Sequence, residues 1–556
     1  MSFLLAAAST EAQAKSVAFD IDHDDVQKLT GHFVKHMRAA LTRVGPSQIP
    51  SYVRQVPDGT EKGTFLAVDL GGTNCRVCSI ELHGDFTYTL VQSKHLVPPE
   101  LRVNAFYKPL FGFIAERIQD FLADHPESDL DTVPKENECI PSEAGELTQE
   151  NHRKLGFTFS FTCHQESLAK GTLLHWDKGW DIPEALGKDP CAMLQEAIDD
   201  LTLPIHVTAL ANDSVGTLMA RAYTSPEKSS TLMSAIFGTG TNAAYIEKLQ
   251  NVTKLHHQAD FRDHTPDHLM VVNTEWGCFD DDMEVLPTTE YDDILDSASQ
   301  DPGMQMLEKR ISGLYLGELL RLVVVQLLEA GFLDMTTSST SPLLLREGID
   351  SSILSILARD GSESLEESRR HIADALKAQG VTYEDANAIR EVAGAISRRA
   401  ARLAGSAMAA VIIQSGRMQA AKALLDDESK PVEITLHGRK SKQSEPARAF
   451  AFSRFRSRVN VLLRRLLKIF GFPNAASSFF PDTSSVPRSK EETPTTIEGD
   501  TIDIGVDGSL IEFHPSFEQD IREALADVFG SGERRVRIGL AKNGSSVGAA
   551  LMAASM

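Results

Sequence analysis

The sequence predicts an α/β protein that folds into two lobes around a central cleft. Strand-like and helix-like runs alternate irregularly along the chain, which is typical of this class. Two glycine-rich turns each lie between apolar runs, and this pattern predicts strand, tight turn, strand. The first lies in residues 65–81, FLAVDLGGTNCRVCSIE, and the second in residues 235–247, AIFGTGTNAAYIE. Because the turns occupy different halves of the chain, we expect two lobes that hold one ligand from opposite sides.

The first turn has the composition of an anion site. Gly71 and Gly72 let the backbone approach a ligand closely, because neither carries a side chain. Donors gather at the same place from three further residues: Thr73, Asn74 and Arg76. Such a turn suits a nucleotide phosphate, and Asp69 before it could hold the water shell of a metal ion. The alternative is an ordinary hairpin with two glycines at its tip.

The second turn repeats this composition in five consecutive residues: Gly238, Thr239, Gly240, Thr241 and Asn242. Neither turn fits the phosphate loop Gly-x4-Gly-Lys-Ser/Thr, which leads from a strand into a helix. Neither fits the dinucleotide fingerprint, which needs three spaced glycines. The two turns therefore predict an ATPase whose phosphate sites are hairpins rather than helix N-termini.

The composition of the chain argues against some classes of function. Its 556 residues are enough for two or more lobes, and 42% hydrophobic with 24% charged residues is ordinary for a soluble globular protein. The net charge of −23 argues against a nucleic-acid partner, which would need a basic surface. An acidic surface also favours a neutral substrate over a strongly anionic one.

Cysteine usage and apolar runs bear on the compartment. Cys75 and Cys78 form a C-x-x-C pair within a strand, but no second pair exists for zinc, so we interpret them as structural thiols. Sparse cysteines indicate a reducing compartment. The N-terminal run lacks the basic residues of a secretory signal, and no run reaches the roughly 18 apolar residues that span a bilayer. We therefore expect a cytoplasmic protein without a transmembrane segment.

The spacing of apolar residues predicts the main elements in order. Helical spacing occurs over residues 22–43, 110–124, 313–331, 386–414 and 547–554. Apolar runs predict strands at 205–210 and 535–541, and the second strand leads through a glycine-rich turn into the last helix. Residues 125–150 are rich in Glu, Ser and Pro, which predicts a loop or disordered excursion.

Residues 425–500 differ in composition from the rest of the chain. The stretch 447–470 is basic, contains no acidic residue and repeats apolar residues at helical spacing. A basic amphipathic helix can lie on an anionic membrane or dock to a partner. A Ser/Pro/Thr-rich segment, 477–496, follows it. The alternative interpretation is a disordered insertion that tolerates drift, or sequence retained from an intron.

Asn212 and Asp213 follow an apolar strand, at the strand end where α/β proteins place side chains in the cleft. The Asp213 carboxylate could accept a proton from a hydroxyl nucleophile during phosphoryl transfer. The alternative is helix capping, in which Asp213 or Ser214 is the N-cap of a helix over residues 215–221.

Three other segments carry polar groups that suit a polyhydroxylated ligand, because each hydroxyl needs a donor and an acceptor. Residues 155–180 place Ser160, Asp177 and Lys178 among strand-forming residues. Residues 273–277, NTEWG, add amide and carboxylate groups, and so does Glu308. Glu308 fits the surface of a helix equally well.

Several motifs, in this order along the chain, resemble the eukaryotic hexokinase family and most of all its fungal glucokinases. They are FLAVDLGGTNCRV, LGFTFSF with GTLLHWDKGW, ALANDSVGTLMARAY, AIFGTGTNAAYIEK, VVNTEWGCFD, DPGMQMLEKRISGLYLGELLRL and IGVDGSLIEFHPSF. The resemblance covers most of residues 25–425 and 500–555. It implies the actin-like ATPase fold, which is ribonuclease H-like. It also implies ATP-dependent phosphorylation of a hexose, with glucose expected, as the first step of glycolysis.

The resemblance implies three parts of the chain. Residues 1–64 would form an N-terminal helical segment that packs on the large domain. Residues 65–211 would form the small domain together with a C-terminal helix at 546–556. Residues 212–545 would form the large domain, which contains the insertion at 425–500. The length matches one catalytic unit, as a monomer or a dimer.

Carried over position by position, the resemblance makes Asp213 the general base that takes the proton of the sugar's 6-hydroxyl, with Lys178 and Arg76 as further catalytic residues. The positions that match sugar contacts are Ser160, Asp177, Lys178, Asn212, Asp213, Asn242, Glu275 and Glu308. Those that match nucleotide motifs are Asp69, Gly71, Gly72, Thr73, Asn74, Arg76, Gly238, Thr239, Gly240, Gly505, Asp507, Gly508 and Ser509. Mg²⁺ would arrive with ATP rather than at a metal centre of the protein.

Three departures from the family pattern bear on activity. Asp177 stands where the family has Thr, and its carboxylate could offset part of the charge of Lys178. Thr162 replaces a Pro and loosens the loop that holds Ser160. Ser546 replaces a Gly, so a backbone position that could need glycine carries a Cβ. These departures favour a weak or inactive regulatory, sugar-sensing paralogue as the first alternative. A kinase of another hexose, such as an amino sugar, is the second.

Overall fold

The computed structural model describes residues 2–125, 152–176, 179–225, 231–256, 258, 261, 268–419 and 501–555. Side chains are described from residue 10 onward. Four sequence predictions lie outside these residues: nearly all of the excursion at 125–150, the insertion at 425–500 with its basic stretch, and the site residues Asp177 and Lys178.

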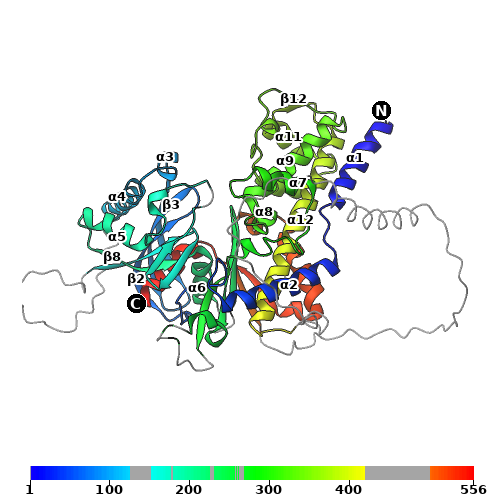
Figure 1. Ribbon diagram of the computed structural model, residues 1–556. Helices are drawn as coiled ribbons and strands as arrows, with labels where there is room; N and C mark the ends of the chain where they lie inside the picture. Colours follow the sequence, from blue (N-terminus) through cyan, green and yellow to red (C-terminus); the bar gives the residue numbers. More distant parts are fainter. Residues whose placement is uncertain are drawn as a thin grey trace, which may run out of the picture. The chain divides into compact units, whose positions relative to one another are not determined.

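The first of two large sheets has five strands in the order β4-β3-β2-β5-β8 (Figure 1). The strands are β2 (Lys62–Leu70), β3 (Asn74–His83), β4 (Tyr88–Leu96), β5 (Arg153–Phe159) and β8 (Ile205–Ala211). β2, β3 and β4 are antiparallel, as the predicted hairpin requires. β2, β5 and β8 are parallel, so their carboxyl ends lie at one edge of the sheet.

The alternating residues of β2 face two different layers, because side chains alternate along a strand. Leu66, Val68 and Leu70 pack in one buried cluster with α4 (Lys108–Asp124) and α5 (Pro190–Asp200). Ala67 belongs to a different buried cluster on the opposite face, which includes the C-terminal helix. Both faces of this sheet are therefore covered, as a partly parallel sheet requires.

The second large sheet has six strands in the order β1-β11-β10-β9-β14-β15. The strands are β1 (Ile49–Pro50), β9 (Thr231–Phe237), β10 (Thr241–Lys248), β11 (Leu269–Asn273), β14 (Ile502–Asp507) and β15 (Val536–Leu540). β9 and β10 form the second predicted hairpin. β9, β14 and β15 are parallel, so their carboxyl ends also meet at one edge.

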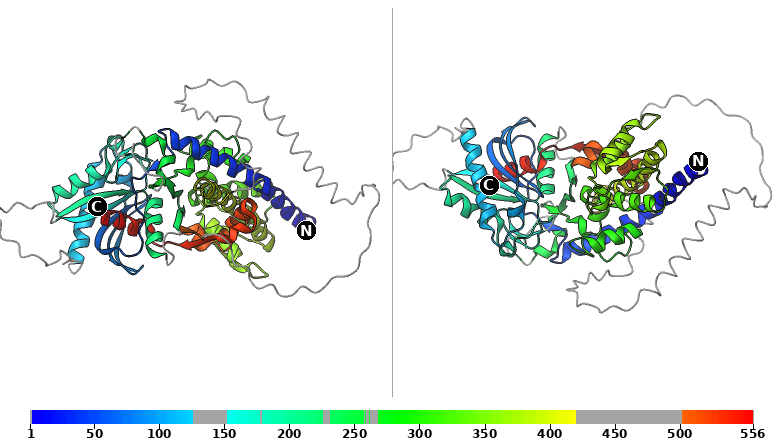
Figure 2. Two further views of the ribbon diagram at one scale, coloured as in Figure 1. Left: turned by 90° about the horizontal axis from the view of Figure 1, so that it is seen from below. Right: turned by 90° about the horizontal axis from the view of Figure 1, so that it is seen from above.

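Two helices pack against each other between the sheets, and each packs mainly on one of them. α6 (Asp213–Thr224) contacts β9, β10 and β14, whereas α16 (Gly544–Ala554) contacts β2, β5 and β8. In Figures 1 and 2, α16 is the red helix against the cyan strands. The two helices can approach closely because Gly548 has no side chain: a Cβ there would lie only 2.0 Å from the carbonyl oxygen of Gly216.

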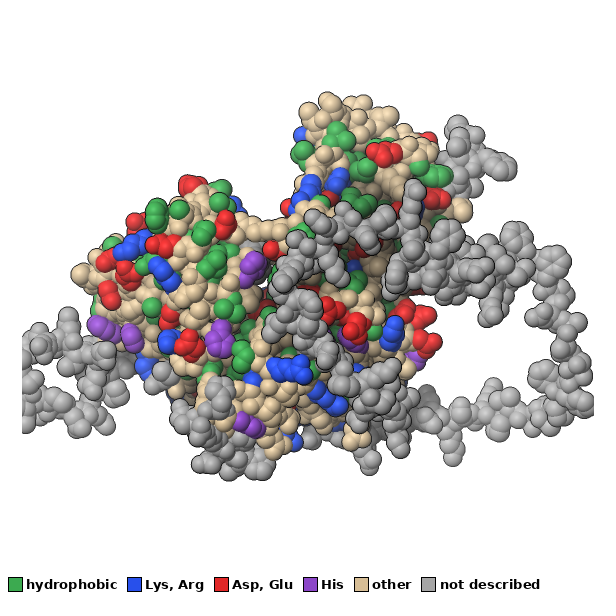
Figure 3. All heavy atoms as spheres, in the orientation of Figure 1, with side chains coloured by type: hydrophobic (Ala, Val, Ile, Leu, Met, Phe, Trp, Pro, Cys, Tyr) green, Lys and Arg blue, Asp and Glu red, His purple; other side chains and the backbone are tan. Residues whose placement is uncertain are grey.

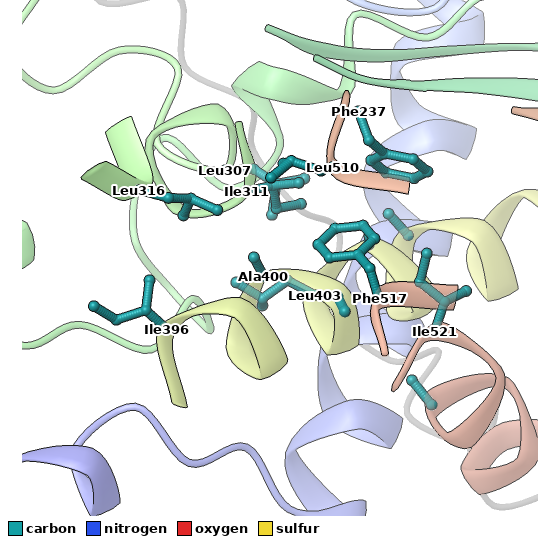
Figure 4. Close-up of a cluster of buried hydrophobic side chains, with 14 of the residues drawn as sticks. Phe237, Leu307, Ile311, Leu316, Ile396, Ala400, Leu403, Leu510, Phe517 and Ile521 are labelled. Atoms are coloured by element: carbon teal, nitrogen blue, oxygen red, sulfur yellow. The ribbon is translucent and has the colours of Figure 1, made fainter. Parts of the chain in front are cut away.

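The outer face of the six-stranded sheet is covered by helices that share one large hydrophobic core. These helices are α1 (Ser2–Val17), α2 (His23–Thr42), α9 (Gly313–Glu329), α12 (Tyr383–Gln414) and α15 (Phe517–Phe529). Figure 4 shows the centre of this core. Phe237 from β9 lies above Phe517 from α15, and Leu403 from α12 lies beside them.

The remaining elements are short and mostly peripheral. The helices are α3 (Pro99–Arg102), α7 (Glu290–Ala298), α8 (Glu308–Ile311), α10 (Ser352–Arg359), α11 (Glu366–Leu376) and α14 (Ser509–Phe513). The paired short strands are β6 (Cys163–Ser167) with β7 (Lys170–Leu173), and β12 (Thr336–Thr337) with β13 (Ala378–Gln379). The 3-10 turns are Pro183–Ala185, Leu249–Asn251, Thr253–Leu255, Trp276–Cys278, Pro342–Leu344 and Gly530–Arg535.

The five predicted helices and two predicted strands are confirmed, with ends that move by a few residues. Capping boxes begin two of these five helices, with Asp22 and Asp25 at α2 and with Thr382 and Asp385 at α12. No helix within the described part of the chain has a segment both long and apolar enough to cross a membrane. On the face shown in Figure 3, acidic and basic side chains are interspersed.

The expectation that Ser546 occupies a position in need of glycine is wrong. Ser546 lies inside α16 and has no left-handed φ, so its Cβ fits the helix. Its buried side chain instead hydrogen-bonds to Cys78. The residue with the unusual backbone is Asn543, at φ +57°, and asparagine tolerates this conformation better than most residues.

Candidate active site

A cavity of about 270 Å³ lies at the carboxyl ends of β2, β5, β8, β9 and β14. Ligands of α/β proteins bind outside the carboxyl ends of strands, so this is the expected place for a site. Of the residues predicted for the site, the following line the cavity: Asp69, Gly71, Gly72, Arg76, Ser160, Asn212, Asp213, Thr239, Gly240, Asn242, Glu275, Glu308, Asp507 and Gly508. The structure therefore brings together residues from both glycine turns and from every predicted sugar-binding segment in the described ranges.

A second cavity, of about 570 Å³, shares Thr239 with the first. It is lined by Gly238 and Ser509, two further predicted nucleotide residues. The Arg359 guanidinium lies in its wall, 5.8 Å from the centre of the Phe513 ring, and donates to the Phe513 carbonyl at 2.5 Å. A partly apolar cavity with a planar cation suits a flat heterocycle.

Three predicted nucleotide residues line neither cavity. The side chains of Thr73 and Asn74 hydrogen-bond to each other at 2.8 Å. Gly505 packs on α6, because a Cβ there would lie 2.7 Å from the Cβ of Arg221. Gly505 therefore serves helix packing, and nothing in its surroundings points to a nucleotide.

Asp213 is the first residue of α6, and only Asn212 separates it from the end of β8. The helix is capped by Asn212, whose Oδ1 accepts from the Ser214 N–H at 2.9 Å. The capping alternative for Asp213 or Ser214 is therefore wrong: the cap lies one residue earlier. One Asp213 carboxylate oxygen accepts from the Ser214 N–H at 2.8 Å, which orients the group at the wall of the cavity.

A chain of amide hydrogen bonds joins Asn212 to Glu275. The Asn242 Nδ2 donates to the Asn212 Oδ1 at 3.2 Å and to the Asn273 Oδ1 at 2.9 Å. The Asn273 Nδ2 in turn donates to the Glu275 Oε1 at 2.8 Å. The carboxylate of Glu308, the first residue of α8, accepts from the Thr241 N–H at 3.3 Å. Polar groups of four segments are thus held in fixed positions before any ligand binds.

The two glycine turns leave open space in front of their backbone. A Cβ on Gly71 would meet nothing closer than 3.9 Å, and the same holds for Gly238. Neither has a left-handed φ, so neither conformation nor crowding requires glycine here. Gly508 is different: its φ is +115°, and a Cβ would lie 2.4 Å from the Phe237 carbonyl. It lets the turn after β14 touch the second hairpin.

Carboxylates dominate the cavity. Five line it: Asp69, Asp213, Glu275, Glu308 and Asp507. Arg76 is the one cationic side chain among the described lining residues, and its Nη1 pairs with the Asp69 Oδ2 at 2.6 Å. Burial raises the pKa of Asp507 to about 6, and the negative charge of Asp213 adds to this shift. An anionic ligand therefore needs a counter-cation to enter.

Sequence reasoning missed three polar residues of the cavity wall: Thr217, Gln305 and Ser545. Ser545 donates to the Asp69 Oδ2 at 2.9 Å, although 476 residues separate the two. Thr217 lies one helical turn after Asp213 and donates to its carbonyl oxygen at 2.8 Å. The i+4 spacing from Asp213, and the glycine-rich turn before the last helix, were the available signals.

The structural interpretation of the C-x-x-C pair is consistent with its surroundings. Cys75 and Cys78 lie in buried clusters on opposite faces of β3. Burial raises the pKa of both thiols, that of Cys78 to about 12. Within the described ranges, no group of three or more His, Cys, Asp or Glu side chains is arranged to hold a metal ion.

The two sheets, their connecting helices and the cavity at their strand ends define an actin-like ATPase fold of the sugar kinase type. Family models described as hexokinase match residues 11–223, and residues 232–460 with 484–555. The chain belongs to the hexokinase family, and it is a kinase.

Individual proteins show the same similarity over nearly the whole chain. A glucokinase of Aspergillus niger is 39% identical over 559 residues, covering 98% of this chain and 96% of its own. Glucokinase-1 of Saccharomyces cerevisiae is 32% identical, with coverages of 96% and 95%. The solved structure of a Schistosoma mansoni hexokinase complexed with glucose is 26% identical, with a TM-score of 0.72 and coverages of 99% and 100%.

Proposed function

We propose that this chain transfers the γ-phosphoryl group of ATP to the 6-hydroxyl of a hexose, with glucose as the preferred sugar and Asp213 as general base. The observation that carries the proposal is the position of Asp213, at the start of α6 and in the wall of the cavity that both glycine turns line. The names of the relatives, glucokinase and hexokinase, support the same reaction. It is the first step of glycolysis, which we place in the cytoplasm.

The amide and carboxylate groups between Asn212 and Glu308 would bind the sugar. Glu275 and Glu308 can each accept from sugar hydroxyls, and the amide groups can donate to their oxygens. The Asn212 oxygen already accepts from Ser214 and Asn242, so its amide nitrogen remains to donate. A site built from such groups rejects a ligand that lacks one hydroxyl, because a buried polar group would then be unpaired. Ser160 completes this set.

Asp213 would act on the hydroxyl that attacks phosphorus. As the O6–H bond breaks, the Asp213 carboxylate takes the proton, O6 bonds to the γ-phosphorus, and the bond to the β-phosphate oxygen breaks to release ADP. Its ordered position one residue after the helix cap favours this role, since the carboxylate need not move far to meet a bound sugar. Closing the cleft would exclude water as a competing acceptor.

The two glycine turns would hold the phosphates, and the second cavity would hold adenosine. The N–H groups of Gly71 and Gly238 donate within their own turns, to the Asn74 and Gly240 carbonyls at 3.0 Å. Open space in front of both glycines would let phosphate oxygens approach the rest of each turn closely. Arg76 would add positive charge on the side of the small domain. Thr239 lies in both cavities, so a nucleotide could extend from one into the other.

The donor set in the phosphate half of the cavity suits magnesium. Asp69 and Asp507 are hard oxygen donors, and the excess of carboxylates there would repel ATP without a cation. We propose that Mg²⁺ enters with ATP and that these two residues contact its water shell. When bound, it neutralises charge on the β- and γ-phosphates. Lys178 and Asp177 stay proposed contacts of sugar and phosphate, outside the described residues.

We also propose the domain boundaries as set from the sequence: a small domain of 65–211 with 546–556, a large domain of 212–545, and 1–64 packed on the latter. Contacts of α16 with β2, β5 and β8 support the first assignment. Contacts of α2 with α12 and α15 support the last.

Sugar-dependent ADP formation tests the proposed function. Glucose, fructose, mannose and N-acetylglucosamine would be compared in one coupled assay with ATP and Mg²⁺, and we expect the highest kcat/KM for glucose. A preference for N-acetylglucosamine would favour a kinase of another hexose. Glucose binding without ADP formation would favour the regulatory paralogue, and either result would contradict the proposal.

A further inference from the structure

The loop that carries Glu275 and the segment just before Glu308 are joined by one carboxylate, beside the part of the cavity where we place the sugar. Asp281, six residues after Glu275, accepts from the Met306 N–H at 2.9 Å and from the Gln305 N–H at 3.3 Å. The Leu307 N–H donates to the Gly277 carbonyl at 3.0 Å. Three consecutive N–H groups just before Glu308 are therefore held by the loop that carries Glu275.

Each of the two segments that Asp281 joins contains a residue with a strained backbone conformation. Gln305 has φ +55° and Glu275 has φ +46°, a left-handed conformation that is strained for a non-glycine residue. Both residues line the cavity. The segments also touch at Gly277, where a Cβ would lie 2.3 Å from the Gln305 Oε1 and 3.2 Å from the Glu308 Cβ. Small displacements in one segment are therefore transmitted to the other.

The charged groups around Asp281 do not fully neutralise the negative charge of its carboxylate. Lys309 acts on the Asp281 carboxylate, but its Nζ is committed to the Asp296 Oδ1 and to the Asp301 carbonyl, both at 2.7 Å. Asp282 repels it, and the half-buried Cys278 is a further titratable neighbour. Burial raises the pKa of Asp281 to about 7, against the two hydrogen bonds and Lys309.

We propose that Asp281 is a positioning residue for sugar binding, whose carboxylate holds Gln305 and Glu308 beside Glu275. The inference rests on the proposed function, because it assumes that a sugar occupies this half of the cavity. Asp281 itself does not line the cavity and takes no part in the chemistry. It acts on the affinity for sugar rather than on the phosphoryl transfer.

The ionisation of Asp281 gives this role a signature in pH. Above pH 7 the ionised carboxylate accepts both N–H groups, whereas below pH 7 the proton on one oxygen weakens one of these bonds. The KM for glucose is therefore expected to rise as the pH falls from 8 to 6, with less change in kcat. A residue needed only for folding would not produce this split.

The test compares Asp281→Asn with the exposed neighbour Asp282→Asn over the same pH range. At pH 8 the Asp281→Asn enzyme should have a KM for glucose about tenfold above the wild type, as expected for one lost charge-assisted hydrogen bond. Its kcat should stay within about twofold, and its KM should no longer change between pH 8 and 6. The Asp282→Asn enzyme should keep the wild-type KM at pH 8, and the rise in its KM should begin at a lower pH, because loss of the Asp282 charge lowers the pKa of Asp281.

Thermal unfolding separates positioning from folding. The raised pKa means that the ionised carboxylate disfavours the folded state above pH 7, so Asp281→Asn should not lower the Tm at pH 8. A wild-type KM in Asp281→Asn, or a wild-type KM that is constant from pH 8 to 6, would overturn this inference alone. Absence of any glucose turnover in the wild type would overturn the proposed function as well.

Discussion

Replacing Asp213 by Asn is expected to lower kcat for glucose phosphorylation by about 10²–10⁴, the range for loss of a general base. Asparagine keeps the size of the side chain, and its oxygen can still accept from the Ser214 N–H. It cannot take the proton of the 6-hydroxyl. The proposed sugar contacts from Asn242, Glu275 and Glu308 are independent of the Asp213 charge, so glucose should still bind.

Tryptophan fluorescence measures that binding without turnover. The chain has three tryptophans, and two of them contact the walls of the cleft. Trp276 donates to the Thr241 Oγ1 at 3.1 Å, and Trp180 donates to the Gly72 carbonyl at 2.7 Å. The exposed Asp124→Asn serves as the control for the same chemical change. A kcat near the wild-type value in Asp213→Asn would end the assignment of the base.

Replacing Asp292 by Asn is expected to lower the free energy of unfolding by about 3–5 kcal/mol, because it removes one partner of a buried ion pair. The Asp292 carboxylate accepts from Arg399 in bidentate fashion, at 2.7 and 2.8 Å. Both side chains are almost fully buried, and the nearby Arg310 is buried too. Without the carboxylate, two guanidinium groups would share the interior uncompensated.

Chemical denaturation measures this loss, with the exposed neighbour Asp293→Asn as control. The deficit also has a defined pH window. Burial alone would raise the pKa of Asp292, but Arg399 and Arg310 lower it from 3.8 to about 2. A carboxyl group whose pKa is lower in the folded than in the unfolded state stabilises the fold at pH values above its unfolded pKa. This contribution is lost as the pH falls from about 4 to 2. The difference between wild type and Asp292→Asn should shrink over that range. A constant difference would contradict the ion-pair explanation.

Features that depend on neighbouring residues in the sequence could be predicted. The two hairpins follow from apolar runs around glycine turns, and the helices follow from apolar spacing. The place of Asp213 at a strand end follows from the apolar run before it. Its exact relation to the helix cap did not follow, because Asn, Asp and Ser at 212–214 are all good N-caps and only the backbone decides between them.

Features that depend on contacts between distant segments could not be predicted. Ser545 reaches Asp69 only because α16 packs on the five-stranded sheet. Gln305 and Asp281 meet because two loops without regular spacing fold over Gly277. Family resemblance located Glu275 and Glu308, but it carried no information on what holds them in place. Thr73 and Asn74 show the converse, since their composition suits an anion site although they line neither cavity.

Phosphorus NMR of the reaction product tests the central claim most directly. The purified chain would be incubated with glucose, ATP and Mg²⁺, and the phosphorylated sugar would be identified by the coupling of its phosphorus to sugar protons. The proposed mechanism predicts a single sugar product, glucose 6-phosphate, whose phosphorus couples to the two protons on C6, with an equal amount of ADP. Phosphate on another carbon, or ADP and inorganic phosphate without any sugar phosphate, would contradict it.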